Sequence, residues 1–77
     1  MREKPLHLAS KLKVIRQRLA LSQTEMKHRL AFQGHYGRIS EYELGRRQPS
    51  VLTLLRYARA AGITLEELVD DELELGL

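Results

Sequence analysis

The sequence predicts an all-α protein, a compact bundle of five short helices, and three observations support this fold class. Aromatic residues make up only 5% of the chain, and β-branched residues never alternate with polar ones over the length of a strand. Apolar residues instead recur at spacings of three and four. Capping patterns and glycines stand at the ends of these periodic segments. At 77 residues with 43% hydrophobic content, the chain can bury one modest core.

The first two predicted helices are separated by a capping pattern at Ser22. The first helix has one apolar stripe, formed by Leu8, Leu12, Ile15 and Leu19. Ser22 and Glu25 form a capping box, in which each side chain accepts from the backbone N–H of the other residue. A second helix is therefore expected to start near Gln23 and to direct Met26 and Leu30 inward.

A third, short helix is bounded by glycines. Gly34 and Gly37 interrupt the periodic pattern before it, and Gly45 ends it as a left-handed residue just past the last turn. Ile39 and Tyr42 lie on one face of this helix and are expected in the core. The loop that follows contains a proline, which lacks a backbone donor and stops the helix from continuing.

The fourth and fifth helices begin at good N-caps. Ser50 caps the fourth helix, which stops at Gly62 and has the apolar residues Leu52, Leu55, Tyr57 and Ala58. Thr64 and Glu67 form a second capping box. It opens a fifth helix with the apolar residues Leu65, Leu68 and Val69. The chain is expected to fray after Asp71.

Charge is divided unevenly along the chain. Residues 1–59 hold all 13 Lys and Arg but only four acidic residues, whereas residues 60–77 hold six acidic residues and no basic one. The first segment therefore carries about +9 and the second −6. A basic segment of this kind is expected in a protein that binds polyanions. From charge alone, an ordinary solvated surface is an equally good explanation. The acidic end is then expected to face away from the polyanion.

Distinct motifs stand at successive helix boundaries. Those of the first three helices are Leu12, Ile15, Arg16, Leu21, Ser22, Gln23, Glu25, Met26, Ile39, Ser40, Glu43 and Gly45. Those further on are Pro49, Ser50, Leu54, Leu55, Ala58, residues 61–63 and residues 65–68. Together they resemble the lambda-repressor-like (Xre/Cro-type) helix-turn-helix family over roughly residues 8–70. The resemblance implies a basic N-terminal arm (1–7), a helix-turn-helix DNA-binding domain (8–71) and an acidic C-terminal tail (72–77).

The resemblance also implies how DNA is bound. The second helix crosses the DNA backbone, and the recognition helix, around residues 36–44, lies in the major groove. Gln23, Arg46 and Arg47 match positions that contact phosphate. Arg38 is the main candidate for reading a base, because a guanidinium pairs with two acceptors of guanine. Glu41 can accept a hydrogen bond from the amino group of cytosine. A local salt bridge or repulsion of phosphates is an equally good explanation for Glu41. The remaining base-reading candidates are Tyr36, Gly37 and Ser40.

The same resemblance predicts one structural pair, and the sequence departs from the family pattern at two places. Arg16 and Glu43 match positions that pair in the family, so they are expected to brace the first helix against the third. The turn at residues 31–35 makes the segment between the second and third helices two residues longer than usual. Lys27 replaces a small residue on the inner side of the second helix, so its aliphatic stem has to extend toward solvent.

The predicted function is sequence-specific binding of double-stranded DNA by a small transcription regulator, a repressor in the simplest case. A homodimer is expected on DNA, through the last helix and tail, since one recognition helix reads too few base pairs. The alternative is an antitoxin-like or other protein-interaction module with a small protein partner, in which Leu73, Leu75 and Leu77 form a docking strip. The three histidines lack the spacing of a catalytic triad or metal site, so no enzyme, cofactor or metal is expected. The lack of cysteine and of a long apolar run indicates a cytoplasmic protein without a membrane span.

Overall fold

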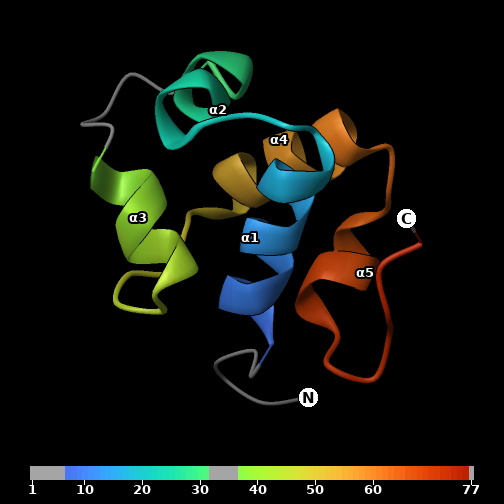
Figure 1. The fold of residues 1–77 in the computed structure, drawn as a ribbon. Helices are drawn as coiled ribbons and strands as arrows, with labels where there is room; N and C mark the ends of the chain where they lie inside the picture. The colour runs from blue at the N-terminus through green and yellow to red at the C-terminus, as the bar shows by residue number, and fades with distance from the viewer. Residues whose placement is uncertain (1–6, 32–36, 77) are drawn as a thin grey trace.

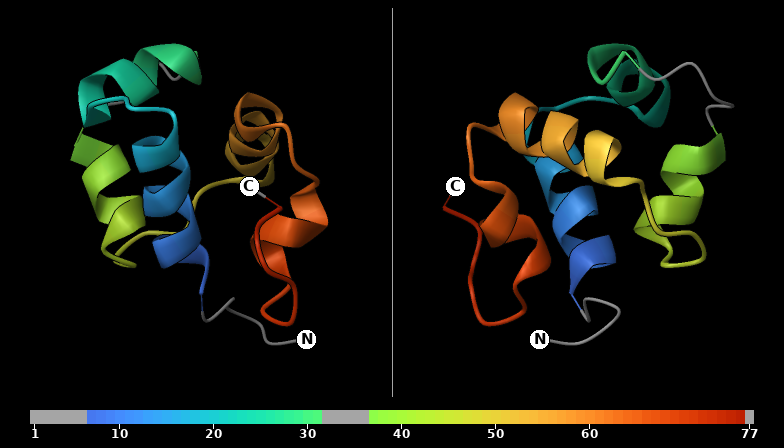
Figure 2. Two further views of the ribbon diagram at one scale, coloured as in Figure 1. Left: turned by 45° about the vertical axis from the view of Figure 1, so that its right-hand side comes forward. Right: turned by 180° about the vertical axis from the view of Figure 1, so that it is seen from behind.

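The computed structural model describes residues 7–31 and 37–76, and within them the chain forms five α-helices and no strand. The helices are α1 (Leu8–Arg18), α2 (Gln23–Arg29), α3 (Gly37–Glu43), α4 (Val51–Ala61) and α5 (Leu65–Val69). The predicted all-α, five-helix fold is confirmed. Helix α1 lies at the centre of the bundle, with α3 on one side and α5 on the other (Figures 1 and 2).

A single apolar core joins all five helices. Its buried residues are Leu8, Leu12, Ile15, Met26, Leu30, Ile39, Tyr42, Leu54, Tyr57, Ala58 and Leu68. The stripe predicted on α1 is confirmed for its first three members, and Leu19 packs against the core at its edge. On α4 the buried apolar side chains come from Leu54, Tyr57 and Ala58, whereas Leu52 is 55% exposed. The core therefore follows the spacings of three and four that the sequence shows.

The ends of α2 and α3 have the predicted local geometry. Ser22 Oγ accepts from the Glu25 amide at 3.1 Å, and Glu25 Oε1 accepts from the Ser22 amide at 2.9 Å, which confirms the capping box. Just past the end of α3, Gly45 has the left-handed conformation, at a φ of 74°. The Arg46 amide then donates to the Glu41 carbonyl at 2.9 Å, which turns the chain back over the last turn of α3.

The expectation that the chain frays after Asp71 is wrong for residues 72–76. Lys11 Nζ donates to the carbonyls of Glu67 (2.7 Å), Asp70 (2.9 Å) and Leu73 (2.8 Å). The carbonyl end of a helix carries partial negative charge, so a buried ammonium group satisfies it well. Lys11 is only 8% exposed. Beyond α5, therefore, the chain is bound to the central helix.

The tail also alters the cap of α5. Thr64 Oγ1 accepts from the Glu67 amide at 3.2 Å, so the predicted N-cap is confirmed. The Glu67 carboxylate, however, accepts from the Gly76 amide at 2.8 Å and from the Thr64 hydroxyl at 3.4 Å, and not from the Thr64 backbone. Leu75 packs against the core. Of the docking strip expected from the sequence, Leu75 is partly buried against the core, Leu73 is 39% exposed, and Leu77 lies outside the described residues.

The junction between α2 and α3 is described only at its two ends. Residues 32–36, which include Tyr36 and most of the lengthened turn, lie outside the described residues, as do residues 1–6 of the expected basic arm. At the end of α2, Arg56 Nη1 lies 3.4 Å from the carbonyl oxygens of Leu30 and Ala31. These contacts bind α2 to α4. No described helix is long and apolar enough to cross a lipid bilayer.

Candidate nucleic-acid interface

Helices α2 and α3 are in contact and lie on one side of the molecule, away from α5 (Figures 1 and 2). Six acidic residues follow position 59, all of them on or after α5. The acidic end of the chain and α3 therefore lie on opposite sides of α1. An anion that approaches α3 meets the basic part of the chain and is kept away from the acidic part.

The orientation of α3 follows from its two buried residues. Ile39 is fully buried and Tyr42 is 4% exposed, so both face α1 and the core. Arg38 and Glu41 are three residues apart and partly exposed, on the face next to this buried pair, and Ser40 is also partly exposed. Gly37 is the first residue of the helix. Of the base-reading candidates that the structure describes, Arg38 and Glu41 thus share one accessible face of α3.

Arg16 and Glu43 hold α3 in this orientation. Arg16 Nε and Nη2 donate to the two carboxylate oxygens of Glu43 at 2.7 and 3.0 Å, and Arg16 Nη1 donates to the Leu21 carbonyl at 2.9 Å. The side chains are 16% and 4% exposed, respectively. The hydrogen bond that Arg16 donates to Glu43 raises the pKa of Arg16 above its usual value. This bidentate pair connects α1, the turn before α2 and α3 in one polar contact.

Gln23, the first residue of α2, lies beside this pair. Its Nε2 donates to Glu43 Oε1 at 3.5 Å, a long hydrogen bond. The side chain is partly exposed, and the residue stands at the amino end of a helix, where backbone N–H groups point outward. The structure therefore places a candidate phosphate-binding amide in contact with the residue that orients α3.

A buried hydroxyl completes this region. Tyr57 is fully buried, and its hydroxyl has no hydrogen-bond partner among the described residues. Burial raises the pKa of this phenol well above its ordinary value, and the negative charge of Glu43 raises it further. The Tyr57 hydroxyl therefore stays protonated next to the Arg16–Glu43 pair.

Arg46 and Arg47 follow α3 in the exposed loop that leads to α4. Arg47 Nε lies 2.9 Å from Glu41 Oε2, and the two side chains are 47% and 43% exposed. The structure thus brings a candidate base reader and a candidate phosphate ligand together, which is the local salt bridge that the sequence left open for Glu41. Arg46 is exposed beside them.

Two basic residues with structural contacts were not singled out from the sequence. Lys11 binds the carbonyls after α5, and Arg56 reaches the end of α2. Lys11 had a recognisable signal, because it stands three residues after Leu8 and four before Ile15, on the buried stripe of the first helix. A lysine at a core position has to bind something with its ammonium group. Arg56 had no comparable signal.

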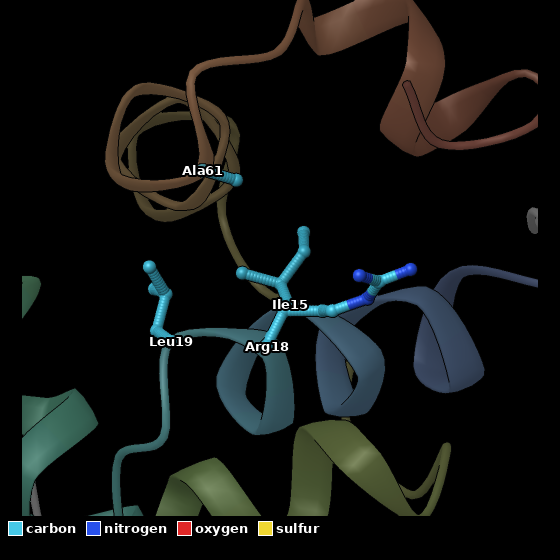
Figure 3. A pocket seen from close by; sticks show the side chains of 4 residues that line it. All are labelled: Ile15, Arg18, Leu19 and Ala61. Carbon is cyan, nitrogen blue, oxygen red and sulfur yellow. The ribbon is translucent and has the colours of Figure 1, made fainter. Parts of the chain in front are cut away.

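A small open groove lies on a different face, between the ends of α1 and α4 (Figure 3). It has a volume of 270 Å³ and is lined by Ile15, Arg18, Leu19 and Ala61. The three apolar side chains face the groove, and the Arg18 guanidinium lies at its edge. Nothing in this lining can act as a nucleophile or general base. Within the described residues, no group of three acidic, histidine or cysteine side chains is placed to hold a metal ion.

The fold and the exposed face of α3 define a helix-turn-helix protein. A family model described as Helix-turn-helix matches residues 12–68, from the middle of α1 to α5. The chain belongs to this lambda-repressor-like helix-turn-helix family, a DNA-binding regulatory family, and the resemblance seen in the sequence is confirmed. No curated protein and no solved structure matches the chain significantly.

Proposed function

We propose that this DNA-binding domain is a sequence-specific transcription regulator, acting as a repressor in the cytoplasm and binding as a homodimer to a two-fold site. The main support is the orientation of α3. Buried Ile39 and Tyr42 and the Arg16–Glu43 pair turn the face with Arg38 and Glu41 outward. A protein that occupies a promoter in this way needs no catalytic group to block transcription.

Within this function we assign Arg38 to reading a base. Its guanidinium can donate two parallel hydrogen bonds to guanine O6 and N7, a contact that distinguishes guanine from the other bases. The further base-reading candidates are Tyr36, Gly37, Ser40 and Glu41. We assign Gln23, Arg46 and Arg47 to phosphate oxygens, which fix the position of the protein without reading sequence.

Selection of bound sequences from a random duplex library tests this proposal. We expect an inverted repeat whose half-sites are about 34 Å apart, one turn of B-DNA, because each α3 of a dimer enters one major groove. Affinity for the selected duplex should fall steeply as salt rises. A library that yields no enriched sequence would count against specific recognition, and enrichment without any repeat would count against the dimer.

A protein-interaction role is the second candidate, and one observation favours it. Among the described residues, the most exposed large apolar side chains flank the α3–α4 loop: Leu44, Val51 and Leu52 are 62%, 71% and 55% exposed. Exposed apolar side chains close together in sequence are typical of a contact surface. The two roles differ in the library experiment, since a protein whose main ligand is another protein should enrich no duplex.

A further inference from the structure

The side chains of Glu41 and Arg47 form an ion pair on the surface assigned to DNA. Glu41 Oε2 accepts from Arg47 Nε at 2.9 Å. We propose that this pair masks Arg47 in the free protein and so lowers the affinity for DNA of unmatched sequence. The inference rests on the proposed function, and it assigns Glu41 a role in specificity beyond its contact with a base.

The backbone after α3 places the two side chains together. Gly45 is left-handed, and the amides of Arg46 and Arg47 both point at the Glu41 carbonyl, at 2.9 and 3.4 Å. The chain therefore folds back over the turn of α3 that carries Glu41. Among the described residues the ion pairs are Arg16–Glu43 and Arg47–Glu41, so Arg46 belongs to neither of them.

The pair is weak enough to open when DNA binds. Both side chains are almost half exposed, at 47% and 43%, so water and salt screen their attraction. A pair of this kind favours the closed state by about two- to fivefold. While it is closed, the negative charge of Glu41 cancels the positive charge that Arg47 would bring to a phosphate. Arg16 and Glu43 differ in this respect, since they are largely buried and are not expected to open.

A matched site opens the pair more readily than an unmatched one. Glu41 lies on the exposed face of α3, where a carboxylate can accept from the amino group of cytosine. When cytosine supplies this donor, the guanidinium of Arg47 is released to a phosphate oxygen. On an unmatched duplex Arg47 remains the donor to Glu41, and the phosphate contact is weakened. Base reading by Glu41 and phosphate binding by Arg47 are in this way coupled.

A double-mutant cycle tests the coupling. The variants are Glu41→Gln, Arg47→Gln and the combination of the two, titrated against scrambled duplexes at several salt concentrations. Glu41→Gln should raise the affinity for scrambled DNA by about two- to fivefold. The slope of log affinity against log salt should steepen by about 0.9, the value for one added phosphate contact. Both effects should be absent when Arg47 is already glutamine. In the Glu41→Gln protein, the preference for the selected site over scrambled DNA should fall.

Arg46→Gln is the matched control. This substitution also removes a cationic side chain from the loop and should itself weaken binding, but it leaves the Glu41–Arg47 pair intact. The gain from Glu41→Gln should therefore persist in the Arg46→Gln protein. Thermal melting of each variant checks that the exposed substitutions leave the fold unchanged.

Three results would overturn the inference. An equal gain with and without Arg47 would mean that Glu41 simply repels phosphates. No gain on scrambled DNA would mean that Arg47 is not masked. A loss of affinity would mean that Glu41 orients Arg47 for binding. In all three cases the wild-type protein still binds its selected duplex, whereas failure of the wild type to bind any duplex rejects the proposed function together with the inference.

Discussion

Glu43→Ala is expected to destabilise the fold by about 2–4 kcal/mol, a large effect for a single substitution on α3. The Glu43 side chain is 4% exposed and accepts two hydrogen bonds from Arg16, at 2.7 and 3.0 Å. Its removal leaves a guanidinium that is only 16% exposed without its counter-ion. Breaking a fully buried pair costs about 3–5 kcal/mol, and the partial exposure of Arg16 lowers this value.

Thermal unfolding followed by circular dichroism measures the effect. For a chain of this size each kcal/mol shifts the melting temperature by about 4–8 °C, so a fall of roughly 8–32 °C is expected. Glu43→Gln is the control, because it keeps the shape and one acceptor oxygen but removes the charge, and it should cost less than alanine. A melting temperature within about 2 °C of the wild type would show that the pair behaves as a solvated surface contact and would refute this reasoning.

Four further predictions concern separate residues. Arg38→Ala should cost about 1–3 kcal/mol on the selected duplex and relax the choice at one base position, whereas Arg46→Ala should weaken selected and scrambled duplexes about equally in titrations at fixed salt. Equal losses for Arg38→Ala on both duplexes would mean that α3 presents a different face. Tyr57→Phe should be stabilising by up to about 1 kcal/mol, because the buried hydroxyl lacks a partner. Since the folded-state pKa of Tyr57 is raised, the contribution of Tyr57 to stability should be constant below the unfolded value of about 10 and fall at higher pH, and the phenylalanine variant should lose less over that range. Ala20→Gly should raise the melting temperature by about 2–4 °C, because Ala20 is held at a φ of 57°, a conformation that glycine adopts without strain. Lys11→Met should cost about 2 kcal/mol and speed hydrogen exchange of the Gly76 amide, because three carbonyls lose their donor; unchanged exchange would show that Leu75 and the Gly76–Glu67 hydrogen bond hold the tail without Lys11.

The ends and inner faces of most helices could be predicted from the sequence. The Ser22–Glu25 box acts over three residues, and Gly45 ends α3 through its own backbone conformation. Ile39 and Tyr42 point inward because they are three residues apart on a helix. All these features depend on contacts within one or two turns, so neighbouring residues carry the whole signal. The fifth helix shows the limit, because its capping glutamate binds Gly76 nine residues away.

The candidate interface could be predicted only in part. Gln23, Arg38, Arg46 and Arg47 were selected because they match family positions, and their contacts with DNA remain predictions. The Glu41–Arg47 pair needs the left-handed turn at Gly45 and a particular direction of both side chains. From the sequence, a base contact, repulsion of phosphates and a salt bridge were therefore equal alternatives for Glu41.

The sequence by itself determined that the chain is helical, where most helices begin and end, and which family it belongs to. Only the tertiary structure decided what the long polar side chains bind. Lys11 and Leu73 are 62 residues apart, and Arg16 and Glu43 are 27 apart. Such contacts exist because packing of the core brings α3 and α5 against α1. Long polar side chains have many rotamers of similar energy, so the partner within reach after packing selects among them.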